Sequence, residues 1–374
     1  MSTNTNPKLS IIIPIYNGAL YLKNTVRSIL ASSYTNLELL LIDDGSIDAS
    51  LTICETLAAS DARIKVYHKA NSGIADTRNY GLDHATGDYV SFCDQDDEIS
   101  SEMYQKMLNR IIHDGSQAAI CGCYRQKRDG SRIIFEKYTD NVFDRPSIEE
   151  KLLLPMLFQG FTLYANREIN IYPTIWNCII SKQLIREKKM TFRSFINYED
   201  DFIMLLQLLL LADRISTSSD ILYCWNTNTQ SELHRSSGRY LNNLELKQQN
   251  FMEYVLNLLS ENGIAPEIIQ QYIYVQQCRN ALLQLDNLAA KNGRKTIRNI
   301  KDLCICNSIS YVCSTPDTVP PSKGFIRNIF IIPLLRKKHV ITAYLMNQLI
   351  NDVRFFVEKY QITERLERKL KKAA

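Results

Sequence analysis

The stretch LSIIIPIYNGALYLKNTVRSIL, residues 9–30, joins an apolar run to an amphipathic segment through Tyr-Asn-Gly. A continuous run of aliphatic and β-branched residues, here residues 9–16, is typical of a strand that is buried on both faces. The segment that follows, about residues 19–32, has the apolar spacing of a helix that covers a sheet. The stretch therefore predicts the first strand and helix of an α/β fold.

The same alternation continues through the first hundred residues. Strands are predicted at residues 37–43, 63–68 and 88–94, and helices at about 48–59 and 75–85. Short apolar strands separated by helices require a mostly parallel central sheet with helices on both faces, a doubly wound, Rossmann-like architecture. Such sheets bind ligands beyond the carboxyl ends of their strands.

The rest of the chain is predicted to be mixed and then helical. A helix at 101–113, a hairpin of 118–126 with 131–138, and a strand at 220–226 follow in order. Ser147 and Glu150 have the spacing of a capping box at the start of a helix. From about residue 238 the pattern is helical. We predict an α/β domain, residues 1–235, and a helical region with a basic amphipathic tail, residues 236–374.

Composition and cysteine content restrict the class of protein. Of the 374 residues, 45% are hydrophobic and 22% are charged, as in soluble globular proteins. No apolar run approaches the roughly 18 residues of a membrane span, and the start of the chain lacks the pattern of a secretory signal, so we expect a cytoplasmic protein. In that reducing compartment the 10 cysteines are expected to be mostly buried free thiols.

Polar side chains follow each of the first four predicted strands. They are Tyr16 with Asn17, Asp43 with Asp44, the segment from Asn71 to Arg78, and the segment from Asp94 to Asp97. Any one of these groups could simply form a turn or a helix cap. Four such groups at one edge of a parallel sheet are much less expected by chance. We therefore predict that they line a single crevice.

Three aspartates crowd the last of these groups, DQDD at residues 94–97. Asp94 and Asp96 are two positions apart, so in extended backbone their side chains leave the same face. Paired carboxylates suit Mg²⁺ or Mn²⁺, which takes few protein ligands and completes its shell with water and phosphate oxygens. The chain has neither a P-loop nor a GxGxxG turn, which argues against ATPases, kinases and most dehydrogenases. We therefore predict a metal that holds a diphosphate.

These motifs resemble those of family 2 of the glycosyltransferases, inverting nucleotide-sugar enzymes of the GT-A fold. The matching segments are LSIIIPIYNGALYLKNTVRSIL, LELLLIDDGSIDAS, NSGIADTRNYGLDHATGDYVSFCDQDDEI and NYEDDF, in the family's order and spacing from about Lys8 to Asp201. The resemblance implies metal-dependent transfer of a sugar from a nucleotide diphosphate, expected to be a uridine diphosphate. It also implies a glycan or lipid-linked acceptor, as in bacterial surface-polysaccharide biosynthesis.

The resemblance also implies roles for the residues that bind the nucleotide. Pro14 and Tyr16 would frame the base, Tyr16 by stacking on it. Asp43 would accept a hydrogen bond from the base, and Arg78 would lie on the nucleotide side of the crevice. Asp94 belongs both to this donor site and to the metal site.

Metal and catalytic roles follow from two further matches. Asp94 and Asp96 match the family's Asp-x-Asp metal motif, and Asp97 is expected to share the metal or touch the donor sugar. Asp200 matches the general base, which removes a proton from the acceptor hydroxyl as that oxygen attacks the anomeric carbon. Without the resemblance, these first-turn acids would be interpreted as complementing the helix dipole. With it, Glu199 is expected to contact acceptor or scaffold.

Some positions carry weaker or contrary signals. Cys178 stands where the family commonly has lysine after Trp-Asn. His234 and Arg235 lie in a segment that resembles the mobile cover of the donor, although a solvated loop is the simpler interpretation. Trp176 and Trp225 could stack on a sugar, but core packing explains them at least as well.

The net charge of +4 is concentrated near the end of the chain. Residues 321–374 contain twelve Lys/Arg and four Asp/Glu, a balance of +8 that leaves −4 for residues 1–320. A basic amphipathic helix can lie on an anionic membrane, here the inner face of the plasma membrane, or it can pack on its own domain with a solvated basic face. Nucleic-acid binding is not expected, because no aromatic-and-basic module accompanies the charge.

The sequence thus predicts an inverting, metal-dependent glycosyltransferase with Asp200 as general base. One alternative is a catalytically silent member of the family that serves as a binding or scaffold subunit. Another is a sugar-nucleotide pyrophosphorylase, which would need a glycine-rich, basic loop after the first strand, and PIYNGALYL at residues 14–22 is neither.

Overall fold

The computed structural model describes residues 6–127, 129–159, 171–196, 199–227, 241–292, 307–314 and 326–359. The chain divides into two compact units. The first comprises Met1–Leu157 with Arg167–Ser231, and the second Phe158–Asn166 with Glu232–Ala374. The predicted domain boundary at residue 235 lies outside the described residues.

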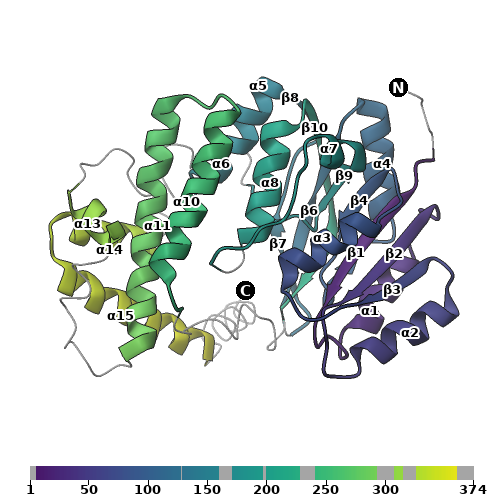
Figure 1. The fold of residues 1–374 in the computed structure, drawn as a ribbon, viewed down its shortest axis with the longest axis horizontal. Coiled ribbons are helices and arrows are strands. Elements are labelled where there is room, and N and C mark those ends of the chain that lie inside the picture. Colours follow the sequence, from purple (N-terminus) through teal and green to yellow (C-terminus); the bar gives the residue numbers. More distant parts are fainter. Residues whose placement is uncertain are drawn as a thin grey trace, which may run out of the picture. The chain divides into compact units, whose positions relative to one another are not determined.

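A mixed sheet forms the centre of the first unit (Figure 1). Its strands are β1 (Leu9–Ile15), β2 (Leu37–Asp43), β3 (Ile64–His68), β4 (Tyr89–Phe92), β5 (Glu98–Ile99), β6 (Ala118–Gln126), β7 (Arg132–Glu136), β8 (Asn141–Asp144), β9 (Cys178–Ser181) and β10 (Arg214–Asn226). The described part of the sheet has the order β3-β2-β1-β4-β9-β6-β10-β5, with β7 beside β6 and β8 beside β10. Strands β3, β2, β1 and β4 are parallel to one another, as predicted. Their carboxyl ends therefore meet at one edge.

Strand β1 is buried on both faces because its alternate residues pack against different helices. Ile11 and Ile13 join a core cluster with α1 (Leu22–Leu30) and α4 (Met103–Asp114), whereas Ile12 meets α3 (Ile74–His84). A Cβ on Gly81 of α3 would lie 2.5 Å from Cγ2 of Ile12, so this close packing needs a glycine. The sheet is thus covered on both faces, as the continuous apolar strands require. The remaining long helices of the unit are α2 (Ser50–Ser60) and α8 (Glu199–Leu211), and the shorter α7 spans Lys182–Glu187.

The helix predicted to begin at Ser147 begins earlier. Asp144 is the N-cap of α5 (Arg145–Ile148): its carboxylate accepts a hydrogen bond from Ser147 N at 3.1 Å, and Ser147 Oγ accepts one from Asp144 N at 3.2 Å. The capping box is therefore Asp-x-x-Ser, and Glu150 has no part in it. Pro146 fits this first turn, where a backbone N–H is not needed. A π-helical turn at Glu149–Leu153 then leads into α6 (Leu154–Leu157).

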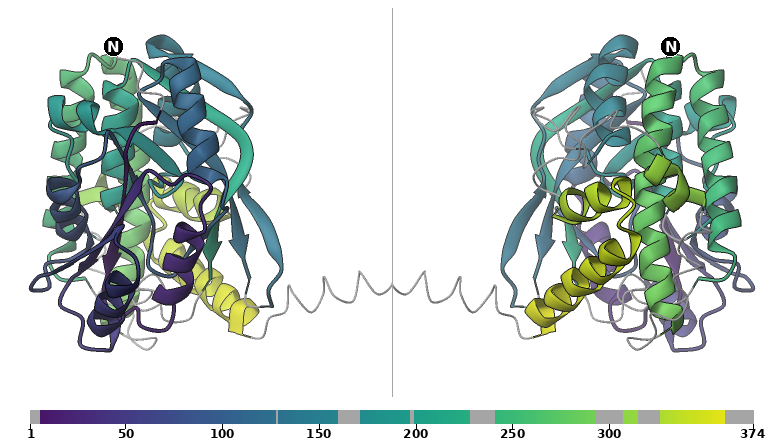
Figure 2. Two further views of the ribbon diagram at one scale, coloured as in Figure 1. Left: turned by 90° about the vertical axis from the view of Figure 1, so that its right-hand side faces the viewer. Right: turned by 90° about the vertical axis from the view of Figure 1, so that its left-hand side faces the viewer.

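Helices make up the described part of the second unit, as predicted. They are α10 (Leu244–Glu261), α11 (Pro266–Asn292), α13 (Asn307–Ser314), α14 (Ile326–Arg336) and α15 (Val340–Lys359). Helices α10 and α11 lie side by side, and α11 also contacts α13, α14 and α15 (Figure 2). Among the helices described, none combines the length and hydropathy that crossing a membrane requires.

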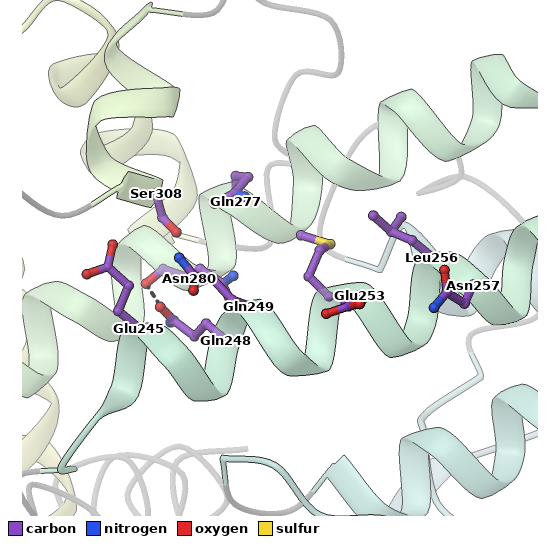
Figure 3. Close-up of a pocket in the computed structure, with 10 residues that line it drawn as sticks. Glu245, Gln248, Gln249, Glu253, Leu256, Asn257, Gln277, Asn280 and Ser308 are labelled. Carbon is purple, nitrogen blue, oxygen red and sulfur yellow. Dashed lines mark hydrogen bonds between the residues drawn. The ribbon is translucent and has the colours of Figure 1, made fainter.

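A cavity of about 370 Å³ lies between α10, α11 and α13 (Figure 3). Buried amides line part of it. Gln248 Nε2 donates to the backbone oxygen of Asn280 at 3.2 Å, and Gln248 Oε1 accepts from Gln284 Nε2 at 2.7 Å. These bonds fix the register of α10 against α11, because a buried amide without partners would cost free energy.

Glu38 on β2 lies at the opposite end of the strand from the crevice and anchors three neighbouring segments. It is 2% exposed, and its carboxylate accepts hydrogen bonds from Lys65 Nζ at 2.7 Å, Ser10 Oγ at 2.6 Å and Lys8 Nζ at 2.9 Å. Burial alone would raise the pKa of Glu38, but these donors hold it below its ordinary value of 4.5. Its stabilising contribution is therefore present above about pH 4.5 and is lost as the pH falls.

Glu38→Gln is expected to lower the free energy of unfolding by about 2 kcal/mol at pH 7.5, the worth of hydrogen bonds to a charged group. The deficit should shrink below about pH 4.5, because the unfolded chain then takes up a proton at Glu38 that the folded protein does not. Urea unfolding of both proteins between pH 7.5 and pH 3 measures this. A deficit that stays constant over the range would contradict the assignment.

Candidate active site

The polar groups predicted to share a crevice are linked to one another at the carboxyl edge of the sheet. Asn17 N, after β1, donates to Ser46 Oγ, after β2, at 3.0 Å. Arg78 of α3 reaches Asp94, after β4, at 2.9 Å. The first bond joins the ends of β1 and β2, and the second joins α3 to the end of β4. The first turn of α8 meets Arg78 through the ion pairs described below.

The end of β1 presents one aromatic ring. Pro14 is buried inside the strand, in register with Ile42, so it supports the site from within the sheet. Tyr16, just past the strand, is 38% exposed. Asn17 has a left-handed backbone with φ of 52°, and its Oδ1 accepts a hydrogen bond from Ile47 N at 2.9 Å. The loop is thus fixed while the ring of Tyr16 remains accessible.

Asp43 ends β2 with one carboxylate oxygen satisfied and one free of partners. Oδ2 lies 2.7 Å from His68 Nδ1 and accepts from Ser46 N at 3.2 Å. Oδ1 is buried and has no hydrogen-bond partner among the residues the structure describes. A buried carboxylate oxygen without a donor costs free energy, so this position favours a ligand that brings an N–H.

Arg78 is the electrostatic centre of the site. Its side chain is 2% exposed, and it bonds three carboxylates: Nη1 contacts Asp200 Oδ2 and, at 2.5 Å, Asp201 Oδ1, while Nη2 contacts Asp94 Oδ1 at 2.9 Å. The face of Phe192 lies 5.4 Å from its guanidinium carbon. The structure thus places Arg78 between the turn after β4 and the start of α8, and not with its guanidinium directed freely at a nucleotide.

One guanidinium neutralises only one of these three carboxylates. With all three ionised, the group Arg78, Asp94, Asp200 and Asp201 carries a formal charge of −2. Burial raises the pKa of Asp201 above its ordinary value, Arg78 opposes the rise, and Asp200 and Asp94 add to it. The cluster therefore favours taking up a further cation or a proton.

The turn after β4 offers hard oxygen ligands on its open side. Asp94 is 33% exposed at its side chain, and Asp96 is partly exposed. The described residues contain no group of three His, Cys, Asp or Glu side chains that would enclose a metal. Two carboxylates fit a Mg²⁺ or Mn²⁺ ion whose other ligands are water and diphosphate oxygens.

Asp97 faces the protein and not the crevice. It is fully buried; Oδ2 accepts from Tyr223 Oη at 2.7 Å and Oδ1 from Asn226 N at 2.8 Å. Asn226 Nδ2 also donates to the backbone oxygen of Asp96 at 2.9 Å. Burial raises the pKa of Asp97 well above its usual range, and the charges of Asp96 and Asp94 add to the effect. Each oxygen thus fastens the turn to β10, which gives Asp97 a structural contact that the sequence did not predict.

The first turn of α8 carries the three acids singled out in the sequence. Asp200 is 3% exposed and Asp201 17% exposed at its side chain, and both meet Arg78. Glu199 Oε2 accepts a hydrogen bond from Ile196 N at 3.0 Å, so one of its oxygens closes the start of the helix. This contact agrees with a scaffold role for Glu199. Of the predicted site residues, His234 and Arg235 lie outside the described part of the chain.

Two further residues that were singled out in the sequence, Trp176 and Cys178, lie in the core. Trp176 is 5% exposed and stacks on Tyr223, with ring centroids 4.3 Å apart. Cys178 is fully buried on β9, and burial raises the pKa of its thiol well above the usual range, so the thiol stays protonated. The cysteines at positions 54, 93, 121, 123, 178, 224 and 278 are free and buried, as expected.

Three site-supporting residues were not identified from the sequence: Tyr223, Asn226 and Glu136. Glu136 on β7 is 2% exposed and accepts hydrogen bonds from Asn177 Nδ2 at 2.7 Å and Tyr172 N at 2.8 Å, which holds the segment that carries Trp176. No local spacing could have revealed these contacts, because the partners lie far apart in the chain. The sequence contains only one sign of such a role, which is that Glu136 follows the apolar residues 133–135 in the strand.

Tyr223→Phe tests the support that β10 gives to the turn at residues 94–97, which is predicted to hold a metal and is called the metal turn below. The change removes the hydroxyl that bonds Asp97 and also accepts from Asp94 N at 3.2 Å, while the ring can stay on Trp176. Loss of such an outer-shell partner is expected to weaken Mn²⁺ binding about 10–100-fold. Calorimetric titration measures it. Tyr34→Phe, which deletes a buried hydroxyl bonded to Pro7 away from the site, is the matched control, and an equal loss in both variants would contradict the proposed support.

Comparison with known proteins adds the following findings. A family model described as Glycosyl transferase family 2 matches residues 10–173. The uncharacterized glycosyltransferase EpsJ of Bacillus subtilis is 29% identical over 226 residues, 60% of this chain and 62% of EpsJ. Glycosyltransferase GlyA of Streptococcus pneumoniae is 31% identical over 162 residues, 42% of this chain and 23% of GlyA. The match thus spans less than two thirds of each of these relatives.

A solved structure shares the fold. The crystal structure of S. aureus TarS residues 1–349 in complex with UDP-GlcNAc superposes with a TM-score of 0.62 and 17% identity, over 92% of each chain. At this identity the likeness concerns the fold alone.

Proposed function

Because the chain belongs to glycosyltransferase family 2 and has the GT-A fold, we propose that it transfers a sugar from a nucleotide diphosphate to an acceptor hydroxyl with inversion at the anomeric carbon. The observation that carries this proposal is the meeting of Asp94 and Asp200 on Arg78. It brings the carboxylate proposed as base beside the turn proposed to hold the donor. An inverting transfer needs these two groups on opposite sides of one sugar.

In the proposed mechanism, Asp200 accepts the proton of the acceptor hydroxyl as the oxygen attacks the anomeric carbon. Arg78 holds Asp200 in position through their ion pair. A divalent cation at Asp94 and Asp96 would neutralise charge on the departing diphosphate. Asp97, Tyr223 and Asn226 keep the turn in place, so the protein does not reorganise during the reaction.

A uridine diphosphate donor is proposed from the end of β2. Uracil presents an N3–H, which is the donor that Asp43 Oδ1 lacks, and the ring of Tyr16 offers a stacking surface nearby. Cytosine and adenine present an acceptor at the corresponding ring position, so they suit this carboxylate less. TarS was crystallised with UDP-GlcNAc, which supports the same donor class here.

Release of nucleoside diphosphate from a panel of nucleotide sugars, with Mn²⁺, Mg²⁺ or chelator, tests the proposal. Slow hydrolysis of one uridine diphosphate sugar, abolished by chelator and by Asp96→Ala, is expected. If nothing is hydrolysed but uridine diphosphate binds in a metal-dependent manner, only the acceptor is missing. Absence of both would favour the silent scaffold subunit. Formation of a nucleotide sugar from nucleoside triphosphate and sugar phosphate would favour the pyrophosphorylase.

A glycan or lipid-linked acceptor at the inner face of the plasma membrane is proposed from the second unit. Ile341, Leu345 and Leu349 lie four residues apart on α15 and are 44%, 47% and 57% exposed, and exposed Lys337 and Lys338 precede the helix. An apolar stripe beside cations is typical of a helix that lies on an anionic membrane. Leu345→Glu should reduce sedimentation with phosphatidylglycerol vesicles. Leu246→Glu, at an exposed leucine of α10, should not.

A further inference from the structure

The side chain of Gln95, between the two aspartates of the metal turn, is bonded to the backbone of Tyr16. Gln95 Oε1 accepts a hydrogen bond from Tyr16 N at 3.0 Å, and Gln95 Nε2 donates to Tyr16 O at 3.1 Å. A single amide thus satisfies both polar backbone groups of one residue, as a neighbouring strand would. The backbone that carries the exposed ring of Tyr16 is held by the turn that carries Asp94 and Asp96.

Gly18 is shaped to receive this amide. A Cβ at Gly18 would lie 2.1 Å from Gln95 Oε1 and 2.5 Å from Cδ, so any side chain there would displace the amide. The turn has a second attachment at its backbone, where Thr25 Oγ1 of α1 donates to Gln95 O at 2.9 Å. Gln95 is therefore enclosed between the loop after β1 and the first helix.

The other side of the loop after β1 is bonded to the loop after β2. Gly18 N donates to Ser50 Oγ at 2.8 Å, and Ala19 N donates to Asp48 Oδ2 at 3.1 Å. The loop at residues 16–19 consequently lies between the segment that follows Asp43 and the metal turn. One end of the loop, at Tyr16, is bonded to the metal turn, and the other end is bonded to the segment after β2. A shift of the turn would therefore move the ring of Tyr16 relative to Asp43.

We propose that Gln95 is a positioning residue that couples the nucleobase subsite, Tyr16 with Asp43, to the metal subsite, Asp94 with Asp96. The inference rests on the proposed function, which assigns those two subsites. A cation that orders the turn orders Tyr16 through Gln95, and a base stacked on Tyr16 orders the turn in return. Such coupling is reciprocal: each ligand must raise the affinity of the other by the same factor.

Uridine is the probe that isolates this coupling, because it has no phosphate and cannot ligate the metal through one. The dissociation constant of uridine is measured by NMR titration with and without saturating Mg²⁺, and that of Mg²⁺ is measured with and without uridine. We expect each ligand to tighten the other by about fivefold or more in the unaltered protein, the lower end of typical coupling. In Gln95→Ala the factor should fall to about one, while each ligand still binds alone.

Two further variants separate coupling from folding. Gly18→Ala keeps Gln95 but should displace its amide, so it is expected to lose the coupling as Gln95→Ala does. Gln105→Ala removes a side-chain amide bonded to Asn109 at 2.9 Å on α4, outside the site, and should keep it. Urea unfolding shows whether each variant is folded. Gln95→Met, which has a side chain of similar length but no amide, replaces Gln95→Ala if that protein fails to fold, and its factor should likewise fall to about one.

The outcomes distinguish the coupling from the function on which it rests. If uridine and the metal bind the unaltered protein independently, or if the Gln95 variants keep its coupling factor, the role of Gln95 is refuted and the proposed function stands. If neither uridine nor a divalent cation binds, the proposed function itself fails and the coupling fails with it.

Discussion

Asp200→Asn is expected to lower the turnover number about 10²–10⁴-fold, the usual contribution of a general base. Asparagine has nearly the shape of aspartate and keeps an oxygen that can accept from Arg78, so the fold and the donor site should be retained. The amide cannot accept the proton of the acceptor hydroxyl. Steady-state transfer, or donor hydrolysis where the acceptor is unknown, gives the turnover number, and calorimetry with uridine diphosphate should show affinity within about twofold of the unaltered protein.

Asp201→Asn is the matched control, because Asp201 is adjacent in the chain and bonds the same guanidinium nitrogen. It should lower the turnover number less than tenfold, since its role is to balance the charge of Arg78. A greater loss in Asp201→Asn than in Asp200→Asn would reassign the base to Asp201. Equal losses would indicate that both changes act through Arg78.

Arg78→Leu is expected to lower the free energy of unfolding by about 3–5 kcal/mol, the cost of leaving buried charges without their partner. Asp94, Asp200 and Asp201 would face one another with no cation among them. Urea unfolding at pH 7.5 measures the loss. Activity should disappear as well, because Asp200 would lose the group that positions it.

The pH dependence of this variant has a definite sign. Arg78 opposes the rise in the pKa of Asp201 that burial causes, so without the cation that pKa is higher still, and the folded variant binds more protons at Asp201 than its unfolded chain does near neutral pH. The deficit should therefore shrink as the pH falls from 7.5 towards 5. Arg63→Leu, which breaks the more exposed ion pair with Asp61, should cost at most about 1 kcal/mol. A loss of that small size for Arg78→Leu would show that the three carboxylates do not depend on it.

Local periodicity explains how much of the fold could be predicted. Strands β1, β2 and β4 are buried on both faces or nearly so, and β3 is half-buried. Their apolar runs are separated by helices, so each element is determined by residues close in sequence. Strands β5 and β8 are two and four residues long and pair with β10 far along the chain, so nothing local predicts them. At the start of α5 the sequence contains two overlapping capping patterns, Asp144 with Ser147 and Ser147 with Glu150. The structure has the first, which places Pro146 in the first helical turn.

The site follows the same division. Residues at strand ends, such as Tyr16, Asp43 and Asp94, could be located because a parallel sheet brings such ends together. The direction in which each side chain points could not be predicted in this way. Asp97 follows Asp96 directly yet points into the protein, because Tyr223 and the backbone of Asn226 occupy its oxygens. Arg78 turns to the acids because they lie within its reach in space, although Asp200 is 122 residues away.

That separation bears on how the protein comes to be made. During synthesis the first four strands and α3 are complete long before α8 leaves the ribosome, so for most of that time Arg78 can meet only Asp94. Contacts between residues so distant close large loops and form slowly. The early α/β half can therefore assemble while Arg78 contacts Asp94 but not yet Asp200 or Asp201. Helix α8 then adds Asp200 and Asp201 to Arg78, and β10 adds the partners of Asp97, so the predicted site is complete only after both elements have been synthesised.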